Sequence, residues 1–332
     1  MRDTHRAVAS ARAAASRSRG WMRFLGRNGI LLALVILLVI GAALSPHFLT
    51  VNNLANVARN TSIVGILGIG MTFVILTRGI DLSVGSMLGF TAIVFALVLG
   101  SGVPWPLAIA LTIVAGGMVG ALNGLGITKG RLQPFIMTLG MLVIARGVTM
   151  SIVDGKPQPL GAAARDVAWL GTGTVAGVPV PVLIFAGLAL FAWFVLRHTT
   201  FGRQVYAVGD NPEAARLSGI STNRVIFSVY VISGMCAAVA ALIEVTRLAT
   251  AVPSQGTGAE LDAIAIVVIG GTSLFGGEGG VGGTVIGAAI IAAVNNLLNL
   301  LGVSPFSQQI VKGLIIVGAV FLERRSRREE GR

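Results

Sequence analysis

Six amide side chains lie in or beside long apolar stretches of this sequence. A carboxamide donates and accepts hydrogen bonds without the desolvation cost of a charge, which suits a neutral solute rich in hydroxyl groups. The same side chains also commonly join one membrane helix to another, and that alternative applies to each of them. The candidates for contact with a solute are Asn123, Gln133, Asn295, Asn296, Asn299 and Gln308.

A second pair with possible chemistry is Arg78 and Asp81, in the segment TRGIDLSVG at residues 77–85. An ion contact between the two side chains would lock a tight turn around Gly79. The functional alternative is a gate at the inner mouth of a path through the membrane.

Three further ionisable residues fall within apolar runs, where a charge is costly unless it meets a partner or a cavity. Glu244 and Arg247 are three residues apart, so on a helix they share a face and can pair directly. Arg146 lies near the end of its run, where a long side chain can extend to the membrane surface.

The sequence argues against several other kinds of site. His5, His47 and His198 are scattered and Cys236 is the only cysteine, so no metal site is expected. The glycine-rich string at residues 270–283 lacks the lysine of a phosphate-binding loop, so nucleotide hydrolysis would need another polypeptide. No nucleophile–base spacing of an enzyme is present.

The elements that position these residues are membrane helices. The chain is 54% hydrophobic and 11% charged, far below the roughly 25% charge of a soluble domain. Continuous apolar runs fit α-helices rather than the alternating strands of a membrane barrel. We expect an all-α polytopic membrane protein with about ten spans, near residues 30–45, 60–77, 82–100, 106–127, 134–151, 180–196, 225–249, 261–276, 281–301 and 309–322.

Charge sets the expected orientation. The net charge of +12 comes from 25 basic residues, most of them in the two termini and in the loops that share a side with the N-terminus. This is the positive-inside pattern, and it places both termini in the cytosol rather than indicating nucleic-acid binding. The basic tails then suit contact with anionic lipid. The long basic start favours an uncleaved first span over a cleaved signal peptide.

A polar segment, FGRQVYAVGDNPEAARLSGI at residues 201–220, interrupts the apolar runs. Asp210 or Asn211 suits a helix N-cap, Pro212 suits the first helical position, and Gly219 suits the end. So short a helix is not stable alone in water, which predicts that it docks on another surface.

The apolar side chains of this short helix are small. Ala214, Ala215 and Leu217 would form a compact knob. A knob of this kind on the cytosolic face of a membrane protein predicts a soluble partner there.

The two halves of the chain show a faint internal similarity. Asp81 and Asp262 each lie near the start of a span, about 180 residues apart, and Asn123 has counterparts in Asn295 and Asn296. A separation of about five spans predicts inverted five-helix repeats, with a solute path at their interface.

Several strings of the chain resemble the ribose/xylose-type monosaccharide permeases of bacterial ATP-binding-cassette importers. The resemblance covers nearly everything from about residue 52 to residue 322. It rests on TRGIDLSVG, on LNGLGITKGRLQPFIMTLG at 122–140, on RGVTMSIVDGKP at 146–157, on GRQVYAVGDNPEAARLSGI at 202–220, and on GAELDAIAIVVIGGTSLFGGEGGVGGTVIGA at 258–288.

The resemblance implies a permease domain over residues 29–323, with a cytosolic coupling loop at 197–224, a basic extension at 1–28 and a tail at 324–332. It implies a second permease copy, a cytosolic ATPase that binds ATP and magnesium, and a periplasmic sugar-binding protein, in the bacterial inner membrane. The short helix corresponds to the ATPase-coupling helix of that family. The residues expected to take part are Gly209, Asp210, Asn211, Glu213, Ala214, Ala215, Arg216, Leu217 and Gly219.

Two rival functions remain open at this stage. A branched-chain amino-acid permease of the same superfamily would handle a zwitterion, and Arg146, Glu244 and Arg247 can be interpreted in that way. A secondary transporter would use no ATPase, but it would leave the docking helix without a purpose.

Overall fold

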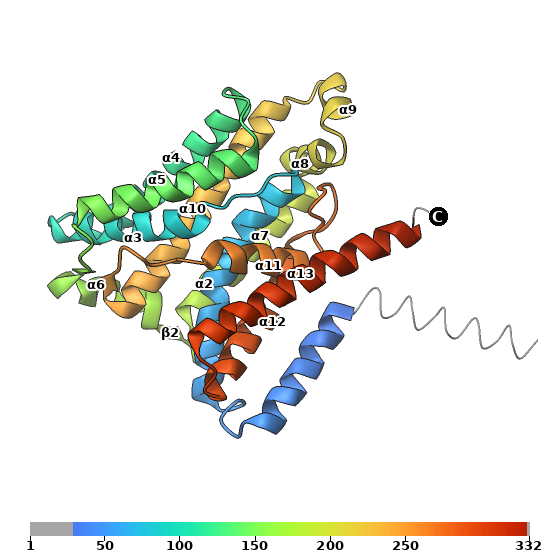
Figure 1. Ribbon diagram of the computed structural model, residues 1–332. Coiled ribbons are helices and arrows are strands. Elements are labelled where there is room, and N and C mark those ends of the chain that lie inside the picture. Colours follow the sequence, from blue (N-terminus) through green and yellow to red (C-terminus); the bar gives the residue numbers. More distant parts are fainter. Residues whose placement is uncertain (1–28, 331–332) are drawn as a thin grey trace, which may run out of the picture.

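The computed structural model describes residues 29–330 of the chain, and the predicted extension at 1–28 lies outside them (Figure 1). Most of the described part is helical. The helices in chain order are Gly29–Leu44, α2 (Val51–Leu76), α3 (Val84–Gly100), α4 (Trp105–Thr128), α5 (Pro134–Ile152), η1 (Gly161–Ala163), α6 (Ala164–Thr172), α7 (Val180–His198), α8 (Thr200–Asp210), α9 (Pro212–Leu217), α10 (Thr222–Leu248), α11 (Ala259–Ile269), α12 (Val281–Leu300) and α13 (Pro305–Glu330).

Four two-residue strands complete the described part. The strand β1 (Gln158–Pro159) pairs antiparallel with β4 (Thr250–Ala251), and β2 (Thr174–Val175) pairs antiparallel with β3 (Val178–Pro179). Figure 1 shows α6 and β2 at one end of the helix bundle and α8 and α9 at the other.

The chain is an all-α polytopic membrane protein, as its composition predicts. Within residues 29–330, six helices are long and apolar enough to cross a bilayer: α2, α4, α5, α7, α10 and α12. Two shorter apolar helices, Gly29–Leu44 and α3, join them. Each predicted span falls on a helix, but a count of ten complete crossings is not confirmed.

The predicted span at 261–276 is wrong in its extent. The helix α11 ends at Ile269, so its 11 residues rise only about 16 Å against a bilayer core of about 30 Å. Glycines explain the early end, because Gly270 and Gly271 follow directly and Gly271 has a φ of +81°. The last helix is longer than predicted. It continues to Glu330, beyond the expected end of the permease domain at residue 323.

The interior of the bundle is built around α2 and α10, the two most buried of the six long spans, while α4, α5 and α7 expose most of their apolar side chains. Helix α10 packs closely on α4 because glycines line the contact. A Cβ atom at Gly120 would overlap the carbonyl group of Tyr230 in α10. The glycines Gly116, Gly120 and Gly124 recur every four residues, so they lie on one face of α4 and let α10 approach closely.

The helix contacts of the two halves correspond. Helix α10 packs on α3 and α4, and α2 packs on α11 and α12. Likewise, α3 contacts α4 and α5, as α11 contacts α12 and α13. Two repeats related by a pseudo-two-fold axis would produce this pairing, so the contacts support the predicted repeat, whose relative orientation remains to be tested by superposition.

Candidate functional site

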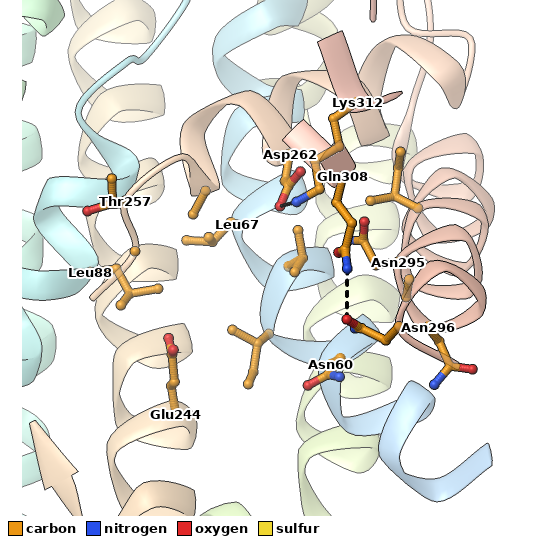
Figure 2. A pocket seen from close by; sticks show the side chains of 17 residues that line it. Asn60, Leu67, Leu88, Glu244, Thr257, Asp262, Asn295, Asn296, Gln308 and Lys312 are labelled. Carbon is orange, nitrogen blue, oxygen red and sulfur yellow. Dashed lines mark hydrogen bonds and ion pairs between the residues drawn. The ribbon is translucent and has the colours of Figure 1, made fainter. Parts of the chain in front are cut away.

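A pocket of about 370 Å³ lies between α2, α3, α10, α11, α12 and α13 (Figure 2). Its volume is in the range of about 300–1,000 Å³ that is typical of small-molecule sites. Its walls hold four of the six candidate amides, contributed by the last two turns of α12 and the first turn of α13: Asn295, Asn296, Asn299 and Gln308.

Two of these amides hold the pocket wall together. Asn296 and Asn53 exchange hydrogen bonds through their carboxamides, with N···O distances of 2.8 and 2.7 Å. Gln308 donates from Nε2 to Oδ1 of Asn299 at 2.8 Å and to the carbonyl of Val303 at 2.9 Å. Asn296 therefore joins α12 to α2, and Gln308 joins α13 to the end of α12.

Asn295 is different from its neighbours in the pocket. Its Oδ1 is buried and accepts no hydrogen bond within the part of the chain that the structure describes. A buried polar atom without a partner is rare in a native protein, and it marks a place where a missing group can bind. Asn295 therefore offers an acceptor to a donor in the pocket.

The pocket also contains charged residues, which the sequence analysis did not place together with the amides. Lys312 forms an ion pair with Asp262 at 2.8 Å, which ties α13 to α11. Glu244 of α10 lies on the opposite side of the pocket from the amides (Figure 2). The sequence could have predicted that Lys312 lies near the amides, because Lys312 follows Gln308 by four residues and therefore lies on the same face of a helix.

The remaining two candidate amides lie elsewhere. Asn123 is fully buried and donates from Nδ2 to the hydroxyl of Ser83 at 2.8 Å. Gln133 is exposed at the residue before α5. Neither residue lines the pocket. Four of the six predicted amides therefore share one site, and the other two lie apart from it and from each other.

Asp81 is the centre of a buried polar cluster. Its Oδ1 accepts from the backbone N–H of Ser83 at 3.0 Å and from its hydroxyl at 2.6 Å, and its Oδ2 accepts from the hydroxyl of Ser233 at 2.8 Å. The cluster joins the start of α3 to α10, and Asn123 of α4 extends it.

The predicted contact between Arg78 and Asp81 is wrong. Arg78 donates instead from Nε to the carbonyl of Gly209 at 2.6 Å and from Nη2 to the carbonyl of Asp210, at the end of α8. The backbone separates the two side chains, because Arg78 adopts a left-handed conformation with a φ of +64°. Asp81 turns inward while Arg78 turns to the surface.

The short helix expected between Asn211 and Gly219 is confirmed as α9 (Pro212–Leu217), and a second helix, α8 (Thr200–Asp210), precedes it. Asn211 rather than Asp210 is the N-cap, since its Oδ1 accepts from the N–H groups of Glu213 at 3.1 Å and Ala214 at 3.0 Å. At the other end Gly219 has a φ of +83°, and the N–H of Ile220 donates to the carbonyl of Ala215 at 3.0 Å. This is a Schellman ending, which requires the left-handed residue that the sequence places there.

The expected knob of α9 divides between two faces. Ala215 is buried against the chain itself, whereas Ala214 is exposed and Leu217 is 75% exposed. Gly209, another residue expected at the partner contact, is buried where α8 meets the end of α2. The exposed residues of α9 are thus Pro212, Glu213, Ala214, Arg216 and Leu217.

The charged residues of this surface are paired with each other. Arg216 and Glu213 form an ion pair at 2.6 Å on the exposed side of α9. The hydrogen bond from Arg216 lowers the pKa of Glu213, so the carboxylate stays ionised to a lower pH than that of an unpaired glutamate. The pair leaves Leu217 as the large apolar side chain that α9 exposes.

The other membrane charges have structural partners. Arg146 donates to the carbonyls of Pro253 at 2.6 Å and Gln255 at 2.9 Å, so it holds the loop before α11. Arg247 donates to Oδ1 of Asn60 at 2.7 Å. The predicted ion pair between Glu244 and Arg247 is not among the salt bridges of the described residues.

Comparison with known proteins shows which characterised sequences this chain is similar to. The ribose import permease protein RbsC of Escherichia coli K12 is 48% identical over 88% of this chain and 92% of its own length. The corresponding protein of Bacillus subtilis is 45% identical over 90% and 92%, and the xylose transport system permease protein XylH of E. coli K12 is 37% identical over 85% and 87%. No solved structure matches the chain.

A family model provides the classification. The model described as branched-chain amino acid transport system / permease component matches residues 53–320, which include α9 and every residue that lines the pocket. The relatives are named as permease proteins, which are transport subunits rather than enzymes. The chain therefore belongs to the family of branched-chain amino acid transport system permease components.

Proposed function

We propose that this chain is the membrane permease subunit of an ATP-driven importer and that it carries a monosaccharide. The single observation that carries the choice of solute is the amide-rich pocket between α2 and α10–α13. Carboxamides suit the hydroxyl groups of a neutral sugar. The relatives named for ribose, allose and xylose support the same class of solute.

The charges of the pocket favour a sugar over an amino acid. A zwitterionic solute needs a cation free to hold its carboxylate, but the ammonium group of Lys312 is bonded to Asp262 at 2.8 Å. Arg146 and Arg247, the other basic residues considered for this role, bind backbone carbonyls and Asn60, respectively.

The proposed assembly has further subunits. A second copy of the chain would complete the path, two cytosolic cassette ATPases would bind ATP and magnesium, and a periplasmic protein would deliver the sugar. The chain would lie in the bacterial inner membrane with both termini in the cytosol, its exposed apolar side chains against lipid. In this orientation the pocket lies in the outer half of the membrane and α9 on the cytosolic face.

The proposed mechanism uses α9 as the transmission element. ATP binding draws the two ATPases together, and their movement reaches the permease through the exposed face of α9, centred on Leu217. The helices would then open the path alternately to the two sides of the membrane. Because the binding protein selects the sugar, the pocket needs only weak affinity.

Uptake into proteoliposomes tests the proposal. The chain is reconstituted with a cassette ATPase and a solute-binding protein from the same organism, and labelled ribose, xylose, allose and leucine are compared with and without enclosed ATP. We expect ATP-dependent uptake of at least one of the three sugars and none of leucine. Uptake of leucine alone would instead support the branched-chain amino-acid alternative, and uptake without ATP would support a secondary transporter.

A further inference from the structure

Arg78 occupies a backbone position where another residue type would be expected. Helix α2 ends in a Schellman turn, since the N–H of Gly79 donates to the carbonyl of Val74 at 3.0 Å and Arg78 takes the left-handed position with a φ of +64°. Glycine is the usual residue there, because a Cβ atom is strained in this conformation. An arginine at this site suggests that its side chain has a use that offsets the strain.

The side chain of Arg78 forms a fork onto the end of α8. Its Nε donates to the carbonyl of Gly209 at 2.6 Å and its Nη2 to the carbonyl of Asp210. These carbonyls belong to the last turn of α8, which is the negative end of the helix dipole, so a guanidinium is well matched to them. Asn211, the N-cap of α9, follows directly.

Two further contacts hold the same junction together. The N–H of Gly277, in the loop between α11 and α12, donates to the carbonyl of Leu76 at 3.0 Å. The hydroxyl of Tyr206 in α8 donates to the carbonyl of Gly279 in that loop at 2.8 Å. A Cβ atom at Gly209 would overlap the carbonyl of Leu76, so three backbone segments meet here without side chains between them.

The residues that follow Arg78 in the chain are bonded to the buried part of the bundle. Two residues on, the carbonyl of Ile80 accepts from the hydroxyls of Thr138 in α5 at 3.2 Å and Tyr230 in α10 at 3.3 Å. Asp81 then binds Ser83 and Ser233. The four-residue segment 78–81 is therefore attached to the α8–α9 element at one end and to α3, α5 and α10 at the other.

We propose that Arg78 is the positioning residue that transmits the movement of α9 to the membrane helices. The proposal rests on the proposed function, because it assumes that α9 receives the ATPase. A displacement of α9 pulls on the end of α8, and the guanidinium fork passes it to the α2–α3 turn. Arg78 thus acts through the helices and not by contact with the solute.

Arg78→Gly separates this role from a structural one. Glycine relieves the strained backbone and keeps the turn at the end of α2, but it removes the two bonds to α8. If Arg78 only held α8 in place, the variant should lose the ATPase on co-purification, and uptake and ATP hydrolysis should fall together. If the fork transmits movement, the variant should still bind the ATPase and hydrolyse ATP, while sugar uptake per ATP hydrolysed falls at least about tenfold. The measurements are co-purification of the ATPase, ATP hydrolysis and uptake in the same proteoliposomes.

Arg131→Gly is the matched control. Arg131 also has a positive φ, of +54°, is exposed, and lies in the loop between α4 and α5 on the same proposed face. This variant removes the same charge and relieves the same kind of strain without touching α8. We expect normal coupling, and an equal loss in both variants would overturn the proposal.

Arg78→Lys is a second test of the role of Arg78, and it does not depend on the folding of the glycine variant. An ammonium group keeps the charge but cannot form the two-pronged contact, so uptake per ATP should fall severalfold and lie between wild type and Arg78→Gly. If Arg78→Gly fails to fold, normal uptake by Arg78→Lys overturns the proposal and a severalfold loss supports it. Wild-type protein that shows no uptake in the same preparation would count against the proposed function instead.

Discussion

Asn295 and Asn296 are adjacent in the chain, but their carboxamides have different roles. Asn296 is engaged in a reciprocal pair with Asn53, whereas Oδ1 of Asn295 is buried in the pocket wall without a partner among the described residues. The physical difference is one of direction, since consecutive residues of a helix point about 100° apart. A binding role and a structural role can therefore be tested on neighbouring positions.

Asn295→Leu should reduce transport without reducing stability. The substitution removes a buried acceptor that has no partner, so the thermal unfolding midpoint of the purified protein should stay the same or rise. Sugar uptake in proteoliposomes should fall about tenfold, because one good hydrogen bond to the solute is worth about 0.5–1.5 kcal/mol and its loss leaves an apolar wall. Unchanged uptake would remove Asn295 from the path.

Asn296→Leu should have the opposite profile. It leaves the carboxamide of Asn53 without its partner, at a cost of about 1–3 kcal/mol in the free energy of unfolding. The double variant with Asn53→Leu should regain most of that loss, because both polar groups are then absent. A double-mutant cycle on the unfolding midpoint measures this, and strictly additive losses would contradict the pairing.

Asp81→Ala should destabilise the protein strongly. The change leaves the hydroxyls of Ser83 and Ser233 without their acceptor in a fully buried place, and each unsatisfied buried group costs about 1–3 kcal/mol. Thermal unfolding of the purified protein should show a clearly lower midpoint. The control is Asp154→Asn, which removes an exposed carboxylate paired with Lys156, keeps a residue type that tolerates the φ of +51° at this position, and should change little.

At the level of elements, α9 presents one face to the permease and the other outward. Ala215 is buried against the chain, so its replacement by glutamate would damage the attachment of α9 as well as any partner contact. Leu217 is the better probe, because its exposed side chain can be changed without disturbing the fold.

Leu217→Asp should abolish coupling while leaving the permease intact. A charge in a packed apolar contact is unfavourable, so we expect the ATPase to be lost on co-purification and sugar uptake to fall below about a tenth of wild type. The unfolding midpoint should not change. Ser221→Ala, just beyond the helix, is the control, and normal uptake by Leu217→Asp would exclude α9 as the docking element.

At the level of the whole molecule, the membrane topology determines on which side of the membrane the pocket and α9 lie. The predicted orientation puts the pocket in the outer half of the membrane and α8–α9 in the cytosol, and α6 and α9 lie at opposite ends of the bundle (Figure 1). Reporter fusions at Lys156 and Arg203 should accordingly report the periplasm and the cytosol. A periplasmic signal at Arg203 would contradict both the topology and the coupling role of α9.

The correspondence of contacts between the halves leads to a structural prediction. Residues 30–151 should superimpose on residues 180–322 after rotation about an axis in the membrane plane, which pairs Gly29–Leu44 with α7 and α3 with the shorter α11. An experimental structure in which the halves match only in parallel orientation would contradict inverted repeats.

The sequence by itself determined the features that depend on composition and local chemistry. Continuous apolar runs required membrane helices, since backbone polar groups in lipid must be satisfied within the segment. The pattern Asn211-Pro212 and Gly219 specified a short capped helix, because caps depend on residues a few positions apart. Residue types also selected the amides as the groups suited to a neutral solute.

Only the tertiary structure decided which of these residues meet. It gathered Asn295, Asn299 and Gln308 in one pocket, sent Asn123 to the Asp81 cluster, and turned Arg78 away from Asp81 to the end of α8. Such outcomes depend on the packing of helices that are distant in the chain and on a single left-handed residue, and neither leaves a periodic signal. The same reason explains α11, which stops short because two glycines end it where hydropathy alone continues the span.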